Sequence, residues 1–399
     1  MTISVRDAVF NPSAQTPTTH PGASMRFTVS EMSGSLGDLG TFLPLAAAMA
    51  AVNRMDLGAI FLFAGLMNIA TGVLFRQPVP VQPMKAIAAV AIAEGLTPGA
   101  IAASGMAMGA IVTLLALTGT VSWIERVVPR PVIRGIQAGV GAKLAIKGIA
   151  WTTGLPLLGP DSVALAIAAT IAVALIASRR IPVILILFLL GLGMAGWSVR
   201  NELAMASWAP VSLTPVVPTA HEWLIGLTRG AVPQLPLTLL NSVLAVCALS
   251  GDLFPGRAIP PRKMALSVGV MNLLAVPLGG MPMCHGAGGL AAQYRFGART
   301  GGSVVMLGIG KIVFAFALGG TLLTIVQAYP RSLLAVMIFF AGVTLMKPAK
   351  ESLGDSRTAA VMLVTGVIIV IGGTLEGFIS GCTLAGVLAF AMRDRGVIA

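Results

Sequence analysis

Two short stretches decide how this sequence folds: QPVPVQPMKAIAAVAIAE at residues 77–94 and PLGGMPMCHGAGGLAAQY at residues 277–294. In each stretch a Pro- or Gly-rich run leads into an apolar segment, 83–94 or 283–294. Both segments are too short to cross a bilayer, because a spanning helix needs roughly 20 residues. Each is therefore predicted to be a half-helix that ends inside a membrane.

The two halves of the chain resemble each other around these stretches. Residues 65–69 (GLMNI) match residues 269–273 (GVMNL) at an offset of 204, and Pro78 then falls on Pro282. Each half holds seven predicted segments, and an odd number makes the second copy enter the membrane from the opposite side. We therefore predict an inverted repeat with one broken helix in each half, an arrangement that frames the substrate site of many secondary transporters.

The composition supports a membrane protein. Of the 399 residues, 56% are hydrophobic and only 10% are charged, whereas a soluble domain carries about 25% charged residues. So few charges exclude a cytosolic enzyme, a disordered regulator and a nucleic-acid-binding domain. The net charge of +12 comes from basic residues in short loops between apolar runs, which is the pattern of membrane topology. Cys247, Cys284 and Cys382 have neither disulfide-framework nor metal-site spacing, and we expect no metal or cofactor.

The expected fold is an all-α polytopic membrane protein with about fourteen segments in a 7+7 inverted repeat. The segments are 30–50, 57–75, 83–94, 98–121, 131–150, 161–178, 181–198, 235–253, 263–278, 283–294, 301–326, 331–347, 357–373 and 376–392. The predicted organisation is a disordered cytoplasmic tail at 1–29, a first repeat at 30–198, an extracytoplasmic connector at 199–230, a second repeat at 231–392 and a short cytoplasmic tail at 393–399.

The distribution of basic residues predicts the orientation. The stretches on the side of the N-terminus, with the segment ends beside them, hold 18 Lys and Arg, and the opposite side holds 5. Because cytoplasmic loops are enriched in these residues, both termini are predicted to be cytoplasmic, in the cell inner (plasma) membrane. Residues 1–25 lack the apolar core of a signal peptide, so we expect them to remain as a tail.

Polar residues inside the segments are the candidates for function, because a charge at the bilayer centre costs at least about 2.5–3.5 kcal/mol. Asp38 is predicted to be a substrate-site or proton-coupling carboxylate, or else the structural partner of a lysine or a backbone amide. Lys85 begins the first half-helix, where a cation is unfavourable unless an anion is also present. The alternative is that Lys85 snorkels or pairs with Asp38. Gln82 offers amide donors beside it.

The second half-helix begins in MCHGAGG at residues 283–289. Its glycines would let backbone N–H groups approach a ligand, and His285 could donate a hydrogen bond or take a proton. The alternative for His285 is an interior residue whose hydrogen bonds are satisfied. Asn241 and Ser242 would complete the site from a facing helix, or bond between helices. Lys143 and Lys311 are interpreted as interior pairing or snorkelling residues.

Residues 33–42, 80–85 and 281–290 closely resemble the motifs of the molybdate transporter family, a branch of the sulfate permease superfamily, and residues 235–242 resemble its eighth helix. The resemblance implies a fourteen-helix inverted-repeat fold and a homodimer. Segments 1–4 and 8–11 would form a core domain, and segments 5–7 and 12–14 a gate domain. The half-helices at segments 3 and 10 would point their N-termini at the substrate, and no C-terminal STAS domain is expected. Many superfamily members carry an acidic residue where Asn241 aligns.

Together these observations predict a secondary active transporter that imports a tetrahedral oxyanion, with molybdate favoured and a proton as the favoured coupling ion. A sulfate transporter on the same scaffold and, less favoured, a nucleobase–cation symporter are the alternatives. No enzyme is expected, since no nucleophile–base constellation is present. The predicted substrate-binding residues are Thr41, Gln82, Met84, Lys85, Asn241, Ser242, Cys284, His285, Gly286 and Ala287, and the proton-coupling candidates are Asp38 and His285.

Overall fold

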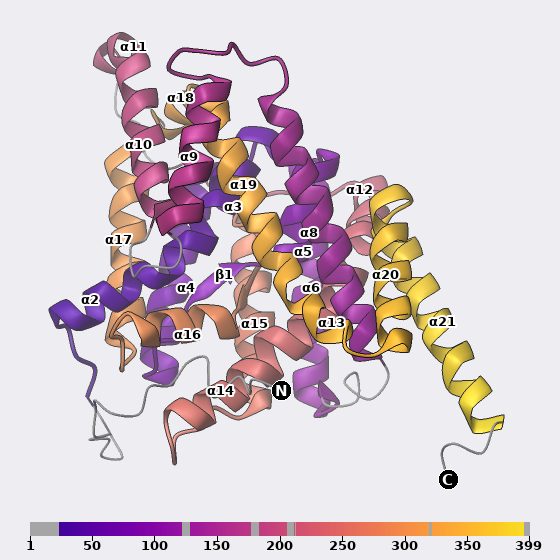
Figure 1. Ribbon diagram of the computed structural model, residues 1–399. Helices are drawn as coiled ribbons and strands as arrows, with labels where there is room; N and C mark the ends of the chain where they lie inside the picture. Colours follow the sequence, from indigo (N-terminus) through magenta and orange to yellow (C-terminus); the bar gives the residue numbers. More distant parts are fainter. Residues whose placement is uncertain are drawn as a thin grey trace.

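The computed structural model describes residues 24–121, 128–176, 183–205, 211, 213–318 and 321–394. Within these ranges the chain is a bundle of helices (Figure 1). The elements of the first half are α2 (Val29–Ser35), η1 (Leu36–Asp38), α3 (Leu39–Asn53), α4 (Leu57–Phe75), β1 (Val81–Pro83), α5 (Lys85–Glu94), α6 (Pro98–Thr118), α8 (Arg130–Thr152), α9 (Val163–Ile176), α10 (Val183–Ser198) and α11 (Arg200–Met205).

The second half begins with one continuous helical run in which α-helix alternates with π-helix. Its elements are α12 (Ala220–Ile225), η2 (Gly226–Ala231), α13 (Val232–Leu237), η3 (Thr238–Leu244) and α14 (Ala245–Leu253). The elements after it are α15 (Pro261–Ala275), η4 (Val276–Leu278), β2 (Met283–His285), α16 (Ala287–Arg295), α17 (Gly302–Leu318), α18 (Thr321–Gln327), α19 (Arg331–Met346), η5 (Lys347–Ser352), α20 (Ser356–Ile371) and α21 (Thr374–Asp394).

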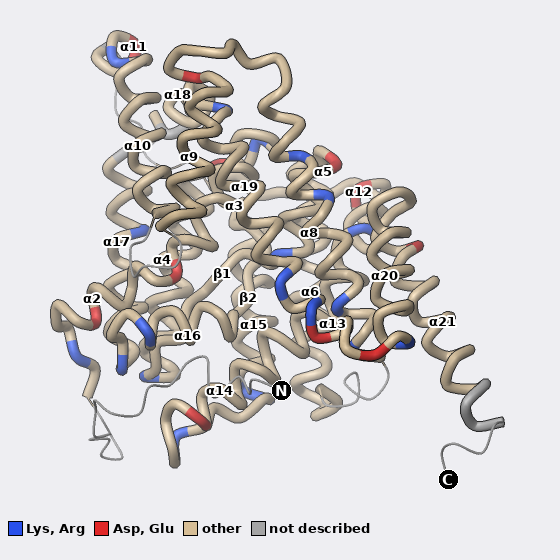
Figure 2. The backbone as a smooth tube through the Cα atoms, viewed as in Figure 1, with Lys and Arg blue, Asp and Glu red and all other residues tan. Residues whose placement is uncertain are grey.

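Each of the fourteen predicted segments overlaps at least one of these helices. In the part of the chain that the structure describes, five helical runs are long and apolar enough to cross a bilayer: Val29–Asn53, Leu57–Phe75, Pro98–Thr118, Ala220–Leu253 and Arg331–Ser352. The two predicted half-helices are present as α5 and α16, with 10 and 9 residues. Charged positions lie mainly toward the two ends of the bundle (Figure 2). The chain is a multi-pass membrane protein, while the count of fourteen and the 7+7 inversion remain predictions.

The structure corrects two expectations about the secondary structure. The fold is not purely helical, because β1 and β2 form a two-stranded antiparallel sheet in which Val81 lies opposite His285. The helix predicted over 235–253 begins earlier, at Ala220, so that helices enter the predicted connector at 199–230. A capping box explains the earlier start, since Thr219 accepts a hydrogen bond from the backbone of Glu222, and the Glu222 side chain accepts one from the backbone of Thr219.

Two matched asparagines hold the strands in place. Oδ1 of Asn68 on α4 accepts a hydrogen bond from the backbone N–H of the first residue of β1, at 2.9 Å. Oδ1 of Asn272 on α15 accepts one from the first residue of β2, at 2.8 Å. The asparagines are 204 residues apart and the strands 202, because the connection after Asn272 is shorter. At the strands the offset between the two halves is therefore 202, so Pro78 lies two residues before the position that corresponds to Pro282.

The long helices pack in reciprocal pairs. α4 packs along α17, α6 packs along α15, and α8 packs against α19 and α20. In the numbering of the predicted segments, α4 and α17 are segments 2 and 11, and α6 and α15 are segments 4 and 9. A two-fold repeat converts the first of these pairs into the second. Small residues allow the close approach: a Cβ on Gly65 of α4 would lie 2.7 Å from the carbonyl oxygen of Gly308 on α17. This reciprocity supports an internal repeat. The strands β1 and β2 and the helix α5 lie in the middle of the bundle (Figures 1 and 2).

Candidate functional site

A cavity of about 260 Å³ lies where the two half-helices begin. It brings together eight of the predicted site residues. These are Gln82, Lys85, Asn241, Ser242, Cys284, His285, Gly286 and Ala287, and the cavity is completed by Gln137, Gln234, Leu237, Gly288, Thr344, Leu345 and Pro348. Among these lining residues Lys85 is the one Lys or Arg, and there is no carboxylate. A cation and several amide and hydroxyl groups without a competing acid form a surface that suits an anion.

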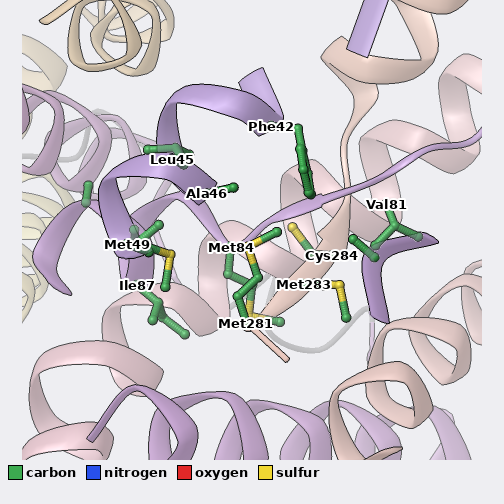
Figure 3. Close-up of a cluster of buried hydrophobic side chains, with 14 of the residues drawn as sticks. Phe42, Leu45, Ala46, Met49, Val81, Met84, Ile87, Met281, Met283 and Cys284 are labelled. Carbon is green, nitrogen blue, oxygen red and sulfur yellow. The ribbon is translucent and has the colours of Figure 1, made fainter. Parts of the chain in front are cut away.

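The two remaining predicted binding residues lie outside this cavity. Thr41 lines a smaller adjoining cavity of about 70 Å³, which shares Lys85, Thr344 and Leu345 with the larger one. The side chain of Met84 is fully buried and lies in an apolar cluster with Met49 and Met281 (Figure 3). The structure therefore places Met84 under the site as packing, and Thr41 at its edge.

The N-terminus of α5 is already capped by a side chain from another helix. Oε1 of Gln234 on α13 accepts hydrogen bonds from the backbone N–H groups of Ala86 (2.9 Å) and Ile87 (3.3 Å). Nε2 of Gln234 donates to Oγ1 of Thr238 at 2.9 Å, which fixes the carboxamide. The expectation that both half-helices point their N-termini at the substrate is therefore modified for α5, since two of its backbone amides have a partner within the protein.

The N-terminus of α16 is different, because in the described part of the chain no side chain accepts a hydrogen bond from the backbone N–H of Ala287 or Gly288, whereas Gln234 accepts two from α5. Ala287 and Gly288 line the cavity there, so a helix end with its partial positive charge faces the cavity. Two glycines of this motif make room for Gln82 rather than for a ligand. A Cβ on Gly286 would collide with Oε1 of Gln82, and a Cβ on Gly289 would lie 2.6 Å from its Nε2, whereas Gly288 has open space beside it.

His285 is held by both of its ring nitrogens. Nδ1 lies 3.2 Å from the carbonyl oxygen of Pro80, and Nε2 lies 3.0 Å from Oγ of Ser267 on α15. Since a carbonyl oxygen only accepts hydrogen bonds, Nδ1 carries the hydrogen toward Pro80. His285 is fully buried, and its ring stands edge-on to Phe75. This geometry favours the interior, hydrogen-bonded interpretation over a proton carrier or a direct donor to the substrate.

Asp38 lies directly behind the cavity, in the 3₁₀ turn that breaks the first helical run. It is fully buried, and its Oδ1 accepts a hydrogen bond from Nε2 of Gln82. Asp38 also interacts electrostatically with Lys311 on α17 and with Lys85. Gln82 therefore connects the lining of the cavity to a buried carboxylate.

A second, wider cavity of about 520 Å³ adjoins the first, and Asn241 lines both. The wide cavity is lined by Arg130 and Arg134 of α8 and by Glu351 of η5. Arg134 pairs with Glu351 and donates a hydrogen bond to Oε1 of Gln137 at 3.0 Å. Gln137 in turn lines the first cavity, so this arginine connects the two spaces. The π-helix η3 carries Asn241, which fits the frequent occurrence of π-helical turns at functional sites.

Sequence reasoning missed Gln137, Gln234 and Thr344. Each is a polar residue near apolar neighbours, the same signal that identified Asn241. Gln234 lies one residue before the predicted segment 235–253, so it is not among the polar residues inside the predicted segments. In the described residues no group of three or more His, Cys, Asp or Glu is arranged to hold a metal ion.

The chain matches a family model described as molybdate transporter of MFS superfamily, over residues 30–144 and 226–345. It is 37% identical to molybdate transporter 2 of Arabidopsis thaliana over 410 residues, which cover 91% of this chain and 88% of that protein. It is 32% identical to molybdate transporter 1 of Chlamydomonas reinhardtii over 490 residues, which cover 94% of this chain and 93% of that protein.

Solved structures show the same fold at low sequence identity. The transmembrane domain of the cyanobacterial bicarbonate transporter BicA superposes with a TM-score of 0.66 at 16% identity, covering 90% of this chain and 98% of that one. The murine Slc26a9 anion transporter in its inward-facing state superposes with a TM-score of 0.69 at 12% identity, covering 93% of this chain and 69% of that one. With a family match over more than half of its length and relatives alike along nine-tenths of it, this chain belongs to the molybdate transporter family.

Proposed function

We propose that this protein is a secondary active transporter that imports a tetrahedral oxyanion, molybdate, through the cavity between α5 and α16. The proposal rests on two positive features that face the same cavity, the ammonium group of Lys85 and the uncapped N-terminus of α16. No carboxylate is among the described residues that line this cavity. The names of the relatives, molybdate transporters in both organisms, and an anion-transporter fold support the same substrate class.

The cavity lies where the predicted core and gate domains meet. Its core side consists of the half-helices and the η3 region, and its gate side consists of Gln137 on α8 and Thr344 on α19. Movement of one domain against the other would carry the anion from one side of the membrane to the other. The wide cavity next to Asn241 would be the path to the cytoplasm, because Arg130 and Arg134 belong to the side that the charge distribution assigns there.

Import of a dianion needs a driving ion. Each negative charge moved into a cell against an inside-negative potential costs about 2.3 kcal/mol per 100 mV, so a dianion costs twice that amount. A proton is the favoured coupling ion in this proposal.

A sulfate transporter would use the same scaffold, since sulfate and molybdate share charge and shape. A nucleobase symporter is less favoured, because the ring N–H groups of a base need an acceptor such as a carboxylate, and the described lining has none.

The proposal is tested by direct binding to the purified protein in detergent. Molybdate, tungstate, sulfate and uracil are titrated against the wild type, Lys85→Ala and Lys143→Ala. Lys143 is the matched control, because it pairs with Glu94 at 2.8 Å and lies outside the cavity lining. We expect Lys85→Ala to weaken molybdate binding by about 10- to 100-fold, the range of a hydrogen bond to a charged group, and Lys143→Ala to change it little.

Each alternative outcome of these titrations has a distinct meaning. Equal losses in the two lysine variants would remove Lys85 from the site. A clear preference for sulfate would keep the scaffold and change the substrate. Binding of uracil alone would overturn the oxyanion assignment altogether.

A further inference from the structure

A buried acid and a buried base lie behind the anion cavity without forming a direct ion pair. Asp38 in η1 is fully buried, and Lys311 on α17 is 3% exposed. Within the described residues, Oδ2 of Asp38 and Nζ of Lys311 have no hydrogen-bond partner. Nζ of Lys311 instead lies 3.6 Å from the centre of the Phe42 ring, a cation–π contact that stabilises an ammonium group in an apolar place.

The surroundings leave Asp38 as the carboxylate that interacts with both lysines. The titratable groups that act on it are Lys311 from α17, Lys85 from α5 and Cys284 from β2. The nearby acid on α2, Glu31, accepts hydrogen bonds from the backbone N–H groups of Arg299 and Thr300 instead. His285 has both ring nitrogens bonded to other partners.

We propose that Asp38 and Lys311 form the proton site of this transporter, and that Gln82 connects it to the bound anion. The inference rests on the proposed function, since it names the group that carries the coupling ion. With Asp38 ionised, the ammonium groups of Lys85 and Lys311, the carboxylate and a bound dianion carry one net negative charge. A proton on Asp38 makes the loaded site neutral, and a neutral site crosses a low-dielectric region at the least electrostatic cost.

The space around Asp38 favours a proton over a sodium ion, since both ions add the same single positive charge. Asp38 is fully buried. A hard metal cation needs several oxygen ligands around it, whereas a proton binds to one carboxylate oxygen. The proton is taken onto Asp38 from the side on which the anion enters, and it leaves Asp38 for water on the side where the anion is released.

The carboxamide of Gln82 provides the link between the two sites. Its Nε2 donates to Oδ1 of Asp38, while its Oε1 has no hydrogen-bond partner in the described part of the chain. When Asp38 is protonated, the carboxyl group becomes a donor and can bond to Oε1 after the amide turns over. Nε2 is then free to donate to the anion. Proton binding and anion binding therefore favour each other, and each raises the affinity for the other by the same factor.

The first test counts protons in the wild-type protein. Molybdate is titrated by calorimetry in buffers of different ionisation enthalpy, which reports the protons taken up per anion bound. We expect uptake of about one proton per molybdate, as the charge balance requires. Molybdate binding without proton uptake would overturn the proton site and leave the proposed function intact. Absence of molybdate binding would overturn the proposed function itself.

The second test uses Asp38→Asn in liposomes, with Glu31→Gln as the matched control, since Glu31 is also a buried acid. For one coupled proton, and with the membrane potential held at zero, an inward gradient of one pH unit supports about tenfold accumulation of molybdate. We expect this response in the wild type and in Glu31→Gln. We expect Asp38→Asn to lose it while still binding molybdate and exchanging labelled for unlabelled anion across the liposome.

The outcomes of the liposome test separate the possible roles of Asp38. A full response to the pH gradient in Asp38→Asn would overturn the proposal. Loss of molybdate binding by Asp38→Asn would also overturn it, because Asp38 would then be a binding group. Accumulation driven by a sodium gradient and not by a pH gradient in the wild type would assign another ion. Lys311→Met should lose the pH response like Asp38→Asn, and an unchanged response would remove Lys311 from the site.

Discussion

Nδ1 of His285 lies 3.2 Å from the carbonyl oxygen of Pro80, so this ring ties the extended stretch before one half-helix to the strand before the other. The two residues are 205 positions apart in the sequence. The contact accompanies the pairing of β1 with β2, and both features hold the starts of α5 and α16 at a fixed separation. The histidine of the glycine-rich motif is therefore part of the frame of the cavity.

We expect His285→Ala to destabilise the protein more than it weakens the anion contacts. Loss of the ring leaves the buried carbonyl of Pro80 without its partner, which costs about 1–3 kcal/mol. Ser267→Ala removes only the partner of Nε2 and should cost about 0.5–1.5 kcal/mol. Thermal unfolding in detergent measures both effects. A His285→Ala protein of wild-type stability that no longer binds molybdate would show instead that the ring contacts the anion.

The glycines of the same motif should differ in their tolerance of a methyl group. A Cβ on Gly286 would collide with Gln82, whereas a Cβ on Gly288 would meet no atom within 4 Å. We expect Gly286→Ala to lower stability by about 1–3 kcal/mol, as overpacking does, and to weaken molybdate binding by displacing Gln82. Gly288→Ala should fold normally. Unfolding midpoints and molybdate titrations of the two variants provide the comparison, and equal tolerance would contradict the packing of Gln82 against Gly286.

The sequence predicted the half-helices well, because their signal is local. A Pro- or Gly-rich run followed by a short apolar segment is visible within about twenty residues, and α5 begins at Lys85, as its motif suggested. The two strands carry no such signal, since each has three residues and its partner lies about 200 positions away. Asn68 and Asn272 each bond to the first residue of one strand. Their matched positions are visible in the sequence, but these bonds are tertiary contacts.

The candidate site was predictable where the chemistry of a residue was unusual for its place. Lys85 and Asn241 stood out as polar groups in apolar segments, and both line the cavity. The role of Gln234 could not be predicted, because a cap supplied by a helix 148 residues away is a tertiary contact. The start of its helix does carry a signal in the sequence, since Thr219 and Glu222 have the spacing of a capping box.

We expect the charge at position 234 to control anion affinity. Gln234→Glu places a carboxylate at the N-terminus of α5, where the helix dipole favours it, but it also adds a negative charge to the cavity. Molybdate affinity should fall by about tenfold or more, which corresponds to roughly 1.4 kcal/mol of repulsion. Gln234→Met removes the cap, should cost about 0.5–2 kcal/mol of stability, and leaves Ala86 and Ile87 free to bind anion.

Molybdate titrations of the two Gln234 variants distinguish charge from capping. A larger loss of affinity in Gln234→Glu than in Gln234→Met would show that charge dominates. A larger loss in Gln234→Met would mean that the capped geometry of α5, and not the electrostatics of the cavity, determines binding.

Asn241 should be reachable from water and protected by substrate, because it lines both the anion cavity and the wide cavity beside it. We expect Asn241→Cys, in a background in which Cys247, Cys284 and Cys382 are replaced by serine, to react with a small water-soluble thiol reagent. Molybdate at ten times its dissociation constant leaves about a tenth of the sites free, so it should slow the reaction by roughly an order of magnitude.

The matched control is Leu239→Cys on the same π-helix. Leu239 is fully buried and lines neither cavity, so it should react slowly with or without molybdate. Fast labelling of Asn241→Cys without protection would separate the wide cavity from the anion path, and protection by molybdate would join them.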